Sequence, residues 1–265
     1  MTWHLGRLTA FDLETTGVDV EQDRIVTAAV YGVGGGRDID PASWLADPGV
    51  QIPDEAAAVH GITTEHARAE GRPAAQVVDE VVERLALSLG VGIPVVGHNI
   101  GTYDLTLLDR EARRHDVVPL ADRIHPDMRM LVIDTRVLDT HVWPYRRRVS
   151  ETQGARVLKT CAAAYRLPWA DADAHGCEYD ALVAARVAYR IGTLAHTEPE
   201  QWPEEIRAVR RPRFGELRDL DLGALHDAQI KWAAEQAAGL QEHFRKTDPT
   251  AVVDGSWPIR PWGAS

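Results

Sequence analysis

The sequence has few cysteines, no long apolar run and no excess of positive charge, and each of these absences excludes a class of protein. Only two of its 265 residues are cysteines, Cys161 and Cys177, which argues against a disulfide scaffold or a cysteine-rich zinc site. We expect both to be buried as small apolar residues. No run of about 18 apolar residues occurs, which argues against a transmembrane helix. The first residues lack the basic and apolar stretches of a signal peptide, so we expect a cytoplasmic protein.

The charge balance limits how the chain could hold an anionic partner. Its 40 acidic residues outnumber 29 basic ones, for a formal net charge of −11. A protein that coats nucleic acid by bulk electrostatic attraction should be basic, because neutralised phosphates supply most of the non-specific affinity. An enzyme whose carboxylates hold divalent cations is not excluded, since those cations then face the phosphate.

The pattern of apolar residues predicts alternating strands and helices over the first 195 residues. We expect strands at 8–13, 24–33, about 37–45, 94–96 and 131–135. We expect helices at 74–89, 103–114, about 157–166 and about 178–195. The stretch 53–64 suits a loop with short helical turns, and 118–156 looks long and variable. This order predicts an α/β domain at 1–195, followed by a C-terminal extension at 196–265 with one helix near 223–245.

Asp12 and Glu14 are the first candidates for chemistry. Successive side chains of a strand point to opposite faces, so these two carboxylates share one face while Phe11 and Leu13 share the other. Neighbouring carboxylates repel each other, and a hard cation such as Mg²⁺, which prefers oxygen ligands, relieves that repulsion. The alternative is a pair of solvated charges at the end of a strand.

Two further acidic candidates, Asp104 and Asp180, lie near the starts of predicted helices. Asp104 lies where an apolar strand passes through a short turn into a helix, a common place for an active site; it could equally be an acid favoured by the helix dipole. Asp180 falls in the first turns of the last predicted helix, and His175 lies on the loop before it. An imidazole beside a bound water suits a general base, although an isolated His and Asp are more often structural.

These positions belong to four short blocks. FDLETTG (11–17), AVHGITTEH (58–66), GHNIGTYD (97–104) and HGCEYD (175–180) resemble, in this order, the sequence blocks of the DnaQ-like 3′–5′ exonucleases, also known as the DEDDh family. The resemblance covers roughly residues 7–195. Tyr103 stands where the family usually has Phe, and Cys177 where it usually has Ala. Neither difference removes an acidic residue or the histidine.

The resemblance implies a fold, a set of metal ligands and a base. The family fold is ribonuclease H-like, an α/β fold with a five-stranded mixed sheet flanked by helices. Asp12, Glu14 and Asp180 would then ligate two catalytic Mg²⁺ or Mn²⁺ ions, and Asp104 would complete the site, partly through water. His175 would be the general base, and the product a nucleoside 5′-monophosphate.

Substrate contacts are predicted from the resemblance and from one basic cluster. The resemblance places the terminal nucleotide against the backbone around Glu14, Thr15 and Thr16 and against the side chains of His60 and Ile62. Asn99 would orient the substrate, although a structural turn is an equal alternative. A cluster of cations with an aromatic ring can hold phosphates while the ring stacks on a base, and the candidates are Tyr145, Arg146, Arg147 and Arg148. The alternative for that cluster is a solvated loop.

The interpretation that follows is a metal-dependent 3′–5′ exonuclease acting on DNA ends, single-stranded or frayed. One alternative is an exoribonuclease, because the treatment of the 2′-hydroxyl cannot be read from these residues. The other is a silent nucleic-acid-binding or scaffold protein, which would not need five reactive side chains. A polymerase partner is possible, and no membrane association is expected.

Overall fold

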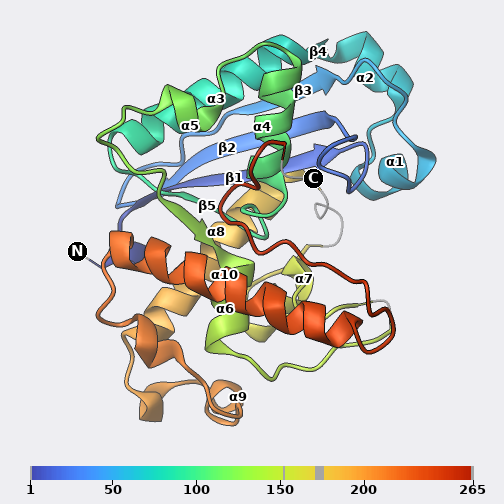
Figure 1. The fold of residues 1–265 in the computed structure, drawn as a ribbon. Helices are drawn as coiled ribbons and strands as arrows, with labels where there is room; N and C mark the ends of the chain where they lie inside the picture. Colours follow the sequence, from blue (N-terminus) through green and yellow to red (C-terminus); the bar gives the residue numbers. More distant parts are fainter. Residues whose placement is uncertain (1, 152, 171–175, 264–265) are drawn as a thin grey trace.

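A six-stranded mixed sheet forms the centre of the computed structural model, which describes residues 2–151, 153–170 and 176–263 (Figure 1). The sheet has the order β4-β3-β2-β1-β5-β6. Its strands are β1 (Arg7–Thr15), β2 (Ile25–Gly34), β3 (Ser43–Asp47), β4 (Arg72–Pro73), β5 (Val95–Gly97) and β6 (Val132–Asp134). β1 runs antiparallel to β2 and parallel to β5, so the carboxyl ends of β1 and β5 meet at one edge of the sheet.

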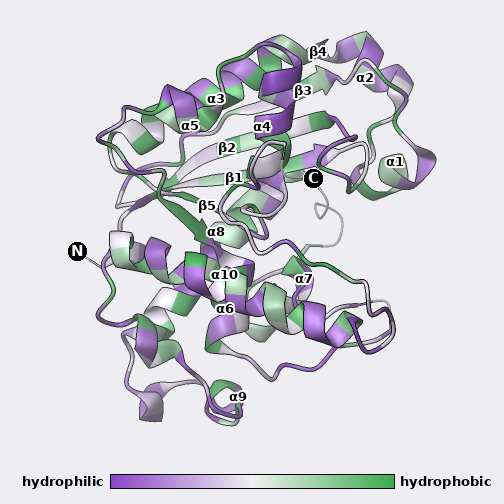
Figure 2. Ribbon diagram, in the orientation of Figure 1, coloured by the Kyte–Doolittle hydropathy of each residue, from purple (hydrophilic) through white to green (hydrophobic). Residues whose placement is uncertain are grey.

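Helices cover both faces of this sheet. On one side lie α3 (Ala74–Gly90), α4 (Asp104–Arg114) and α5 (Leu120–Arg123). On the other side lie α6 (Thr135–Val142), α7 (Leu158–Ala164) and α8 (Cys177–Ala195). The alternation of β1 divides the core accordingly, because Phe11 and Leu13 join the α3 side and Leu8 and Ala10 join the α8 side. Apolar and polar residues alternate around α3 (Figure 2), as expected for a helix with one buried face.

The ribonuclease H-like α/β class predicted from the sequence is confirmed, with three differences in detail. The five expected strands are present, and the two-residue β4 adds a sixth. The strand expected near 37–45 is regular only from Ser43, although Ala42 and Asp40 still exchange backbone hydrogen bonds with Val30 and Gly32 in the same register. Pro41 lies between these two pairs, where an antiparallel ladder uses no N–H from that residue. The short helical turns expected at 53–64 are present as α1 (Asp54–His60) and the start of α2 (Thr64–Glu70).

The third difference is α6, which lies inside the stretch that looked variable. Its first turn is capped by Asp134, whose carboxylate accepts hydrogen bonds from the backbone N–H groups of Arg136 (2.9 Å) and Val137 (3.4 Å). Both cysteines are buried, as expected.

The C-terminal extension covers the edge of the sheet. It contains α9 (Glu204–Arg207), α10 (Leu222–Phe244) and short 3₁₀ turns. Two buried side chains of α10 take the place of a further strand beside β6: Gln229 accepts from the N–H of Asp134 (2.8 Å) and donates to the carbonyl of Val132 (3.0 Å), while His226 accepts from the N–H of Val132 (3.1 Å). A sheet edge buried by a helix needs such partners, because unpaired backbone groups are costly.

The last described residues return from α10 to α4. Trp257 packs so closely on Gly101 that a β-carbon there would lie 2.0 Å from the indole nitrogen. The buried guanidinium of Arg110 donates to the carbonyls of Arg260 (3.0 Å) and Pro261 (3.1 Å). The extension therefore shares its core with the preceding residues and holds the turn that leads into Asp104.

Candidate active site

β1 brings the first two acidic residues together. Asp12 and Glu14 continue the face of Leu8 and Ala10, which packs on α8, and both are half-buried. The pairing with β2 shifts register between Glu14 and Thr15. Such a bulge ends regular pairing and re-aims side chains, as it often does beside active sites.

α8 adds the third acidic residue. The helix begins at Cys177, so Asp180 lies in its first turn, over the end of β1. One carboxylate oxygen each from Asp12, Glu14 and Asp180 lies within 4.8 Å of the other two. Asp12 and Asp180 are 168 positions apart in the sequence, and the structure brings them together with Glu14, as predicted.

Asp104 lies behind this cluster. It is buried at the start of α4, and its Oδ1 accepts a hydrogen bond from the backbone N–H of Leu13 (3.1 Å), which ties α4 to β1. The close packing of the end of β5 on β1 depends on Gly97, because a β-carbon there would lie 2.6 Å from the carbonyl oxygen of Phe11. Asp104 is thus adjacent to the three clustered carboxylates but is not one of them.

The electrostatics of these groups are those of crowded acids. Burial, followed by the carboxylates of Asp180 and Asp104, raises the pKa of Glu14 to about 8. Burial and then the carboxylate of Asp104 raise the pKa of Asp12 well above its usual range. Burial also raises the pKa of Asp104 to about 7, against the opposing effect of its hydrogen bonds to backbone N–H groups. Each shift has the sign expected when a charged group is desolvated beside like charges.

This donor set fits a hard divalent cation. Three carboxylates offer only oxygen ligands, which Mg²⁺ and Mn²⁺ prefer over nitrogen or sulfur. Burial and then neighbouring carboxylates raise the pKa of Asp12 and of Glu14, and a bound cation would offset both effects by stabilising the charged form. The site residues therefore suit the metals that the sequence predicted.

His175 lies outside the described residues, so its role as the general base stays a prediction. It precedes α8 by two positions in the sequence. Glu178, two residues before Asp180, is exposed. Its carboxylate nevertheless contributes to the raised pKa values of both Asp12 and Glu14. Its place two residues from Asp180 was the only signal in the sequence.

Thr15 and Thr16 are both buried at the end of β1. The hydroxyls of Thr15 and Tyr103 lie 2.6 Å apart, and both lie within hydrogen-bond distance of the carbonyl of Gly17. Because each hydroxyl has one hydrogen, one of them donates to the carbonyl and the other donates to that hydroxyl. The hydroxyl of Thr16 donates to Asp23 (2.8 Å). Tyr103, in the place where the family usually has Phe, thus ties the turn after β1 to the start of α4.

His60 and Ile62 lie where the sequence predicted a nucleotide. Together with Glu14 they line a hollow of about 290 Å³ that also reaches Glu178. The Nδ1 atom of His60 accepts from the N–H of Ile62 (3.1 Å), which orients the ring. Burial lowers the pKa of His60, so the ring is neutral at pH 7 and can donate through Nε2.

Asn99 follows β5 directly and has a left-handed backbone, with φ of 69°. Its N–H donates to Asp134 (2.9 Å), and its side-chain oxygen accepts from Thr102 (2.9 Å) and from Arg136 (2.6 Å). It therefore forms the structural turn that was one of the two interpretations, and it still lines an open hollow.

The four residues of the basic cluster do not share one environment. Arg146 is an internal residue: its side chain is 8% exposed, pairs with the buried Asp139 and donates to the carbonyl of Ala155 (2.9 Å). Tyr145, Arg147 and Arg148 are exposed, and the guanidinium of Arg210 from the extension lies 4.8 Å from the Tyr145 ring. Contact with a substrate stays a prediction for these exposed residues, whereas Arg146 has a structural partner.

A mixed sheet whose central strand β1 carries two acidic residues, joined by a third from α8, suits metal-assisted chemistry, and comparison with known proteins specifies the family. The profile of the RNase T family, described as exonucleases, matches residues 9–188. The chain belongs to this family of DnaQ-like 3′–5′ exonucleases, as its sequence blocks predicted. Members of the family use divalent metals.

Curated relatives include bacterial replication proteins. A PolC-type DNA polymerase III from Lacticaseibacillus paracasei is 30% identical over 166 residues, which are 63% of this chain and 10% of that protein. The DNA polymerase III subunit epsilon of Aquifex aeolicus is 31% identical over 110 residues, which are 42% of this chain and 51% of the subunit. The matches thus span about half or less of these relatives.

Solved structures share the fold. An E. coli exonuclease I complex with single-stranded DNA and zinc matches with a TM-score of 0.58 at 17% identity, over 71% of this chain and 41% of that one. The exonuclease I of Methylocaldum szegediense matches with a TM-score of 0.56 at 21% identity, over 76% and 42%. Within the described residues, no helix combines the length and the apolar character needed to cross a bilayer.

Proposed function

We propose that the protein removes nucleoside 5′-monophosphates one at a time from the 3′ end of single-stranded or frayed DNA, with two Mg²⁺ or Mn²⁺ ions. The observation that carries this proposal is the convergence of the Asp12, Glu14 and Asp180 oxygens within 4.8 Å in a chain of the exonuclease family. The four acids Asp12, Glu14, Asp104 and Asp180, which the structure brings together, speak against a silent scaffold, as does the presence of His175 in the sequence block before Asp180.

The chain's own residues have distinct tasks in this proposal. Asp12, Glu14 and Asp180 hold the cations, which supply Lewis-acid stabilisation of the charge that develops on the phosphate. Asp104 braces β1 through the N–H of Leu13 and adds negative charge next to Asp12. The hollow at His60 and Ile62 receives the terminal nucleotide, beside Glu14.

His175 accepts the proton of the attacking water in this proposal. A general base of this kind contributes roughly 10²- to 10⁴-fold to the rate. We expect His175→Ala to lose that factor in kcat and to bind Mn²⁺ as tightly as the parent protein. His125→Ala, which removes an exposed histidine that lines neither the acidic cluster nor the hollow, is the matched control. A His175→Ala variant that retains the parental rate between pH 6 and 8 would remove this assignment.

DNA is proposed as the substrate because the curated relatives belong to DNA polymerases and the E. coli structure holds single-stranded DNA. The same relatives motivate the proposal of a polymerase partner. RNA is the competing substrate, since the 2′-hydroxyl would decide between them.

A panel of 5′-labelled oligonucleotides of one sequence tests the function. Single-stranded DNA, a primer–template with a mismatched 3′ end and RNA are each incubated with Mg²⁺, with Mn²⁺ and with EDTA. We expect a ladder of products shortened from the 3′ end on both DNA substrates, abolished by EDTA. Preferential shortening of RNA would transfer the proposal to an exoribonuclease, and no shortening of any substrate with either metal would overturn it.

A further inference from the structure

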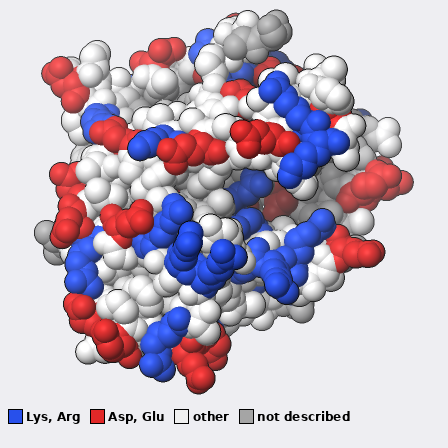
Figure 3. Space-filling view, turned by 60° about the horizontal axis from the view of Figure 1, so that its bottom comes forward, with Lys and Arg blue, Asp and Glu red and all other residues white. Residues whose placement is uncertain are grey.

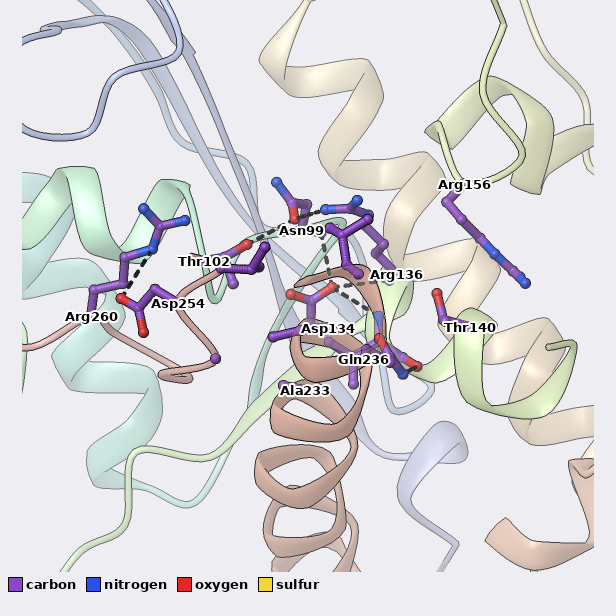
Figure 4. Close-up of a pocket in the computed structure, with 15 residues that line it drawn as sticks. Asn99, Thr102, Asp134, Arg136, Thr140, Arg156, Ala233, Gln236, Asp254 and Arg260 are labelled. Carbon is purple, nitrogen blue, oxygen red and sulfur yellow. Dashed lines mark hydrogen bonds and ion pairs between the residues drawn. The ribbon is translucent and has the colours of Figure 1, made fainter. Parts of the chain in front are cut away.

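Two adjoining hollows lie beyond the acidic cluster, between the extension and the rest of the chain. One, of about 320 Å³, lies between α6, α10 and the C-terminal residues 253–260 (Figure 4). The other, of about 660 Å³, lies between the turn after β5 and residues 154–158. They share Asn99, Arg136, Arg156 and Leu240. We name the two together the arginine groove.

The groove begins beside the proposed catalytic residues. In the parallel pairing of β1 with β5, Ala10 lies opposite Val96. Asp12 lies two residues beyond Ala10 on β1, and β5 ends at Gly97, so His98 and Asn99, which line the groove, directly follow the strand beside β1. A strand whose 3′ end occupies the acidic cluster can therefore pass its preceding nucleotides into this groove.

The groove carries positive charge that the protein itself does not neutralise. Arg136 is exposed and donates to the side-chain oxygen of Asn99 (2.6 Å); no carboxylate oxygen of the described residues lies within 4.0 Å of its guanidinium. Within the described part of the chain, the guanidinium of Arg148 donates to one backbone carbonyl, that of Glu151, and pairs with no carboxylate. By contrast, Asp134 is buried, and its carboxylate accepts hydrogen bonds from the backbone N–H groups of Asn99, Gly101 and Arg136. The face in Figure 3 shows Lys and Arg side chains gathered around a hollow.

The amide of Asn99 adds a neutral donor. Because both Thr102 and Arg136 donate to its oxygen, its orientation is determined, and the NH₂ group points away from them (Figure 4). No described residue accepts from that NH₂ group. Among the described residues that line the groove there is no Phe, Tyr or Trp on which a base could stack. Guanidinium and amide donors without a stacking ring suit phosphates rather than bases.

We propose that the arginine groove is a binding site for the sugar-phosphate backbone of a single strand, just upstream of the 3′-terminal nucleotide, with Arg136 as its principal phosphate contact. This rests on the proposed function and adds a substrate requirement: several unpaired nucleotides, of any sequence. α10, which lies outside the family match, provides one wall through Leu240. In a chain of net charge −11, such local cations must provide the attraction that the whole surface lacks.

Two single variants and one control test the groove. Arg136→Ala and Arg148→Ala each remove a cation from it. Arg37→Ala removes an exposed arginine at the opposite end of the β1–β2 hairpin from Asp12, and is the matched control. Each protein is assayed on a 20-nucleotide single-stranded DNA over a range of salt, and on the nitrophenyl ester of thymidine monophosphate. Binding of the same 20-mer in EDTA is followed by fluorescence anisotropy.

We expect Arg136→Ala to raise KM and Kd for the 20-mer about tenfold, because a charge-assisted hydrogen bond is lost. The slope of log affinity against log salt should fall by roughly 0.7. Arg148→Ala should act in the same direction and less strongly. The small ester should be hydrolysed at the parental rate by both variants, and Arg37→Ala should behave as the parent on both substrates.

The results separate this inference from the proposed function. Equal loss on the 20-mer and the ester would show that Arg136 shapes the active site, and would overturn the groove. Unchanged binding of the 20-mer by Arg136→Ala would overturn it as well. Weakened binding by Arg136→Ala, in a protein that hydrolyses no substrate with either metal, would support the groove and count against the proposed function alone.

Discussion

Two groups of carboxylates are withdrawn from solvent in this protein, and they differ in what surrounds them. Asp139 is fully buried and accepts hydrogen bonds from Tyr165 (2.7 Å) and Arg156 (2.7 Å), and it also pairs with Arg146. No nitrogen of a described Lys, Arg or His lies within 4.0 Å of a carboxylate oxygen of Asp12 or of Glu14. Their nearest charged neighbours are other acids.

The contrast separates a structural carboxylate from a ligand site. A buried acid with two guanidiniums and a hydroxyl holds its surroundings in one arrangement, and here it anchors Arg146 and Arg156 beside the arginine groove. Half-buried acids without cations are poorly placed for stability and are instead poised for an external cation. An aspartate therefore stabilises its surroundings at position 139, whereas an aspartate at position 12 is a candidate metal ligand.

The largest difference between the two groups should appear when Asp12 in one and Asp139 in the other are each replaced by Asn. We expect Asp12→Asn to lower the rate of hydrolysis by at least about a thousandfold, because several kcal/mol of transition-state stabilisation are lost. Its melting temperature in EDTA should stay the same or rise, because like charges no longer repel. Rates on labelled DNA and calorimetry measure the two effects. Normal turnover by Asp12→Asn would break the comparison, and Asp227→Asn, at an exposed position, is the control.

Asp139→Asn should do the reverse. Removal of its charge leaves two guanidiniums in a buried place, so we expect the free energy of unfolding to fall by about 3–5 kcal/mol. Asp227→Asn breaks an exposed pair with Arg129 and should cost only about 0–1 kcal/mol. Urea unfolding followed by tryptophan fluorescence gives both numbers. A loss no larger than that of Asp227→Asn would show that the buried pairing is not an anchor.

A smaller effect concerns pH in the absence of metal. The pKa of Glu14 rises from an ordinary value of 4.5 when unfolded to about 8 when folded. The folded state therefore binds more protons than the unfolded state in this interval, so stability is complete below about pH 4.5 and falls as the pH rises towards 8. We expect the melting temperature in EDTA to decline over this range.

Mg²⁺ should flatten that decline, because the cation replaces the protons, and Glu14→Gln should flatten it without metal. Glu65→Gln, on the exposed surface of α2, is the control and should leave the slope as it is. Calorimetric scans at several pH values between 5 and 9 provide the measurement. An identical slope in Glu14→Gln and the parent would show that Glu14 does not carry this repulsion.

Much of the fold and of the site could be read from local patterns. The alternation in 8–13 placed Asp12 and Glu14 on one face of β1, because strand geometry alone determines which residues share a face. The apolar spacing of α3 and the turn before Asp104 were also visible, since a helical face and a strand end each leave a short-range signal. The order of the sequence blocks then predicted that distant acids meet.

What the sequence by itself determined is therefore the element pattern, the acidic set and the family. Only the tertiary structure decided that Arg146 is internal while Arg147 and Arg148 face solvent, since burial depends on Asp139, a partner on another element. Likewise, nothing local to α10 shows that Gln229 completes the backbone pairing of β6. Nor does it show that Arg136 faces an open groove with no carboxylate oxygen of the described residues within 4.0 Å of its guanidinium. Periodicity reports which residues share a face, whereas the partner of a charge is chosen by contacts between segments far apart in the chain.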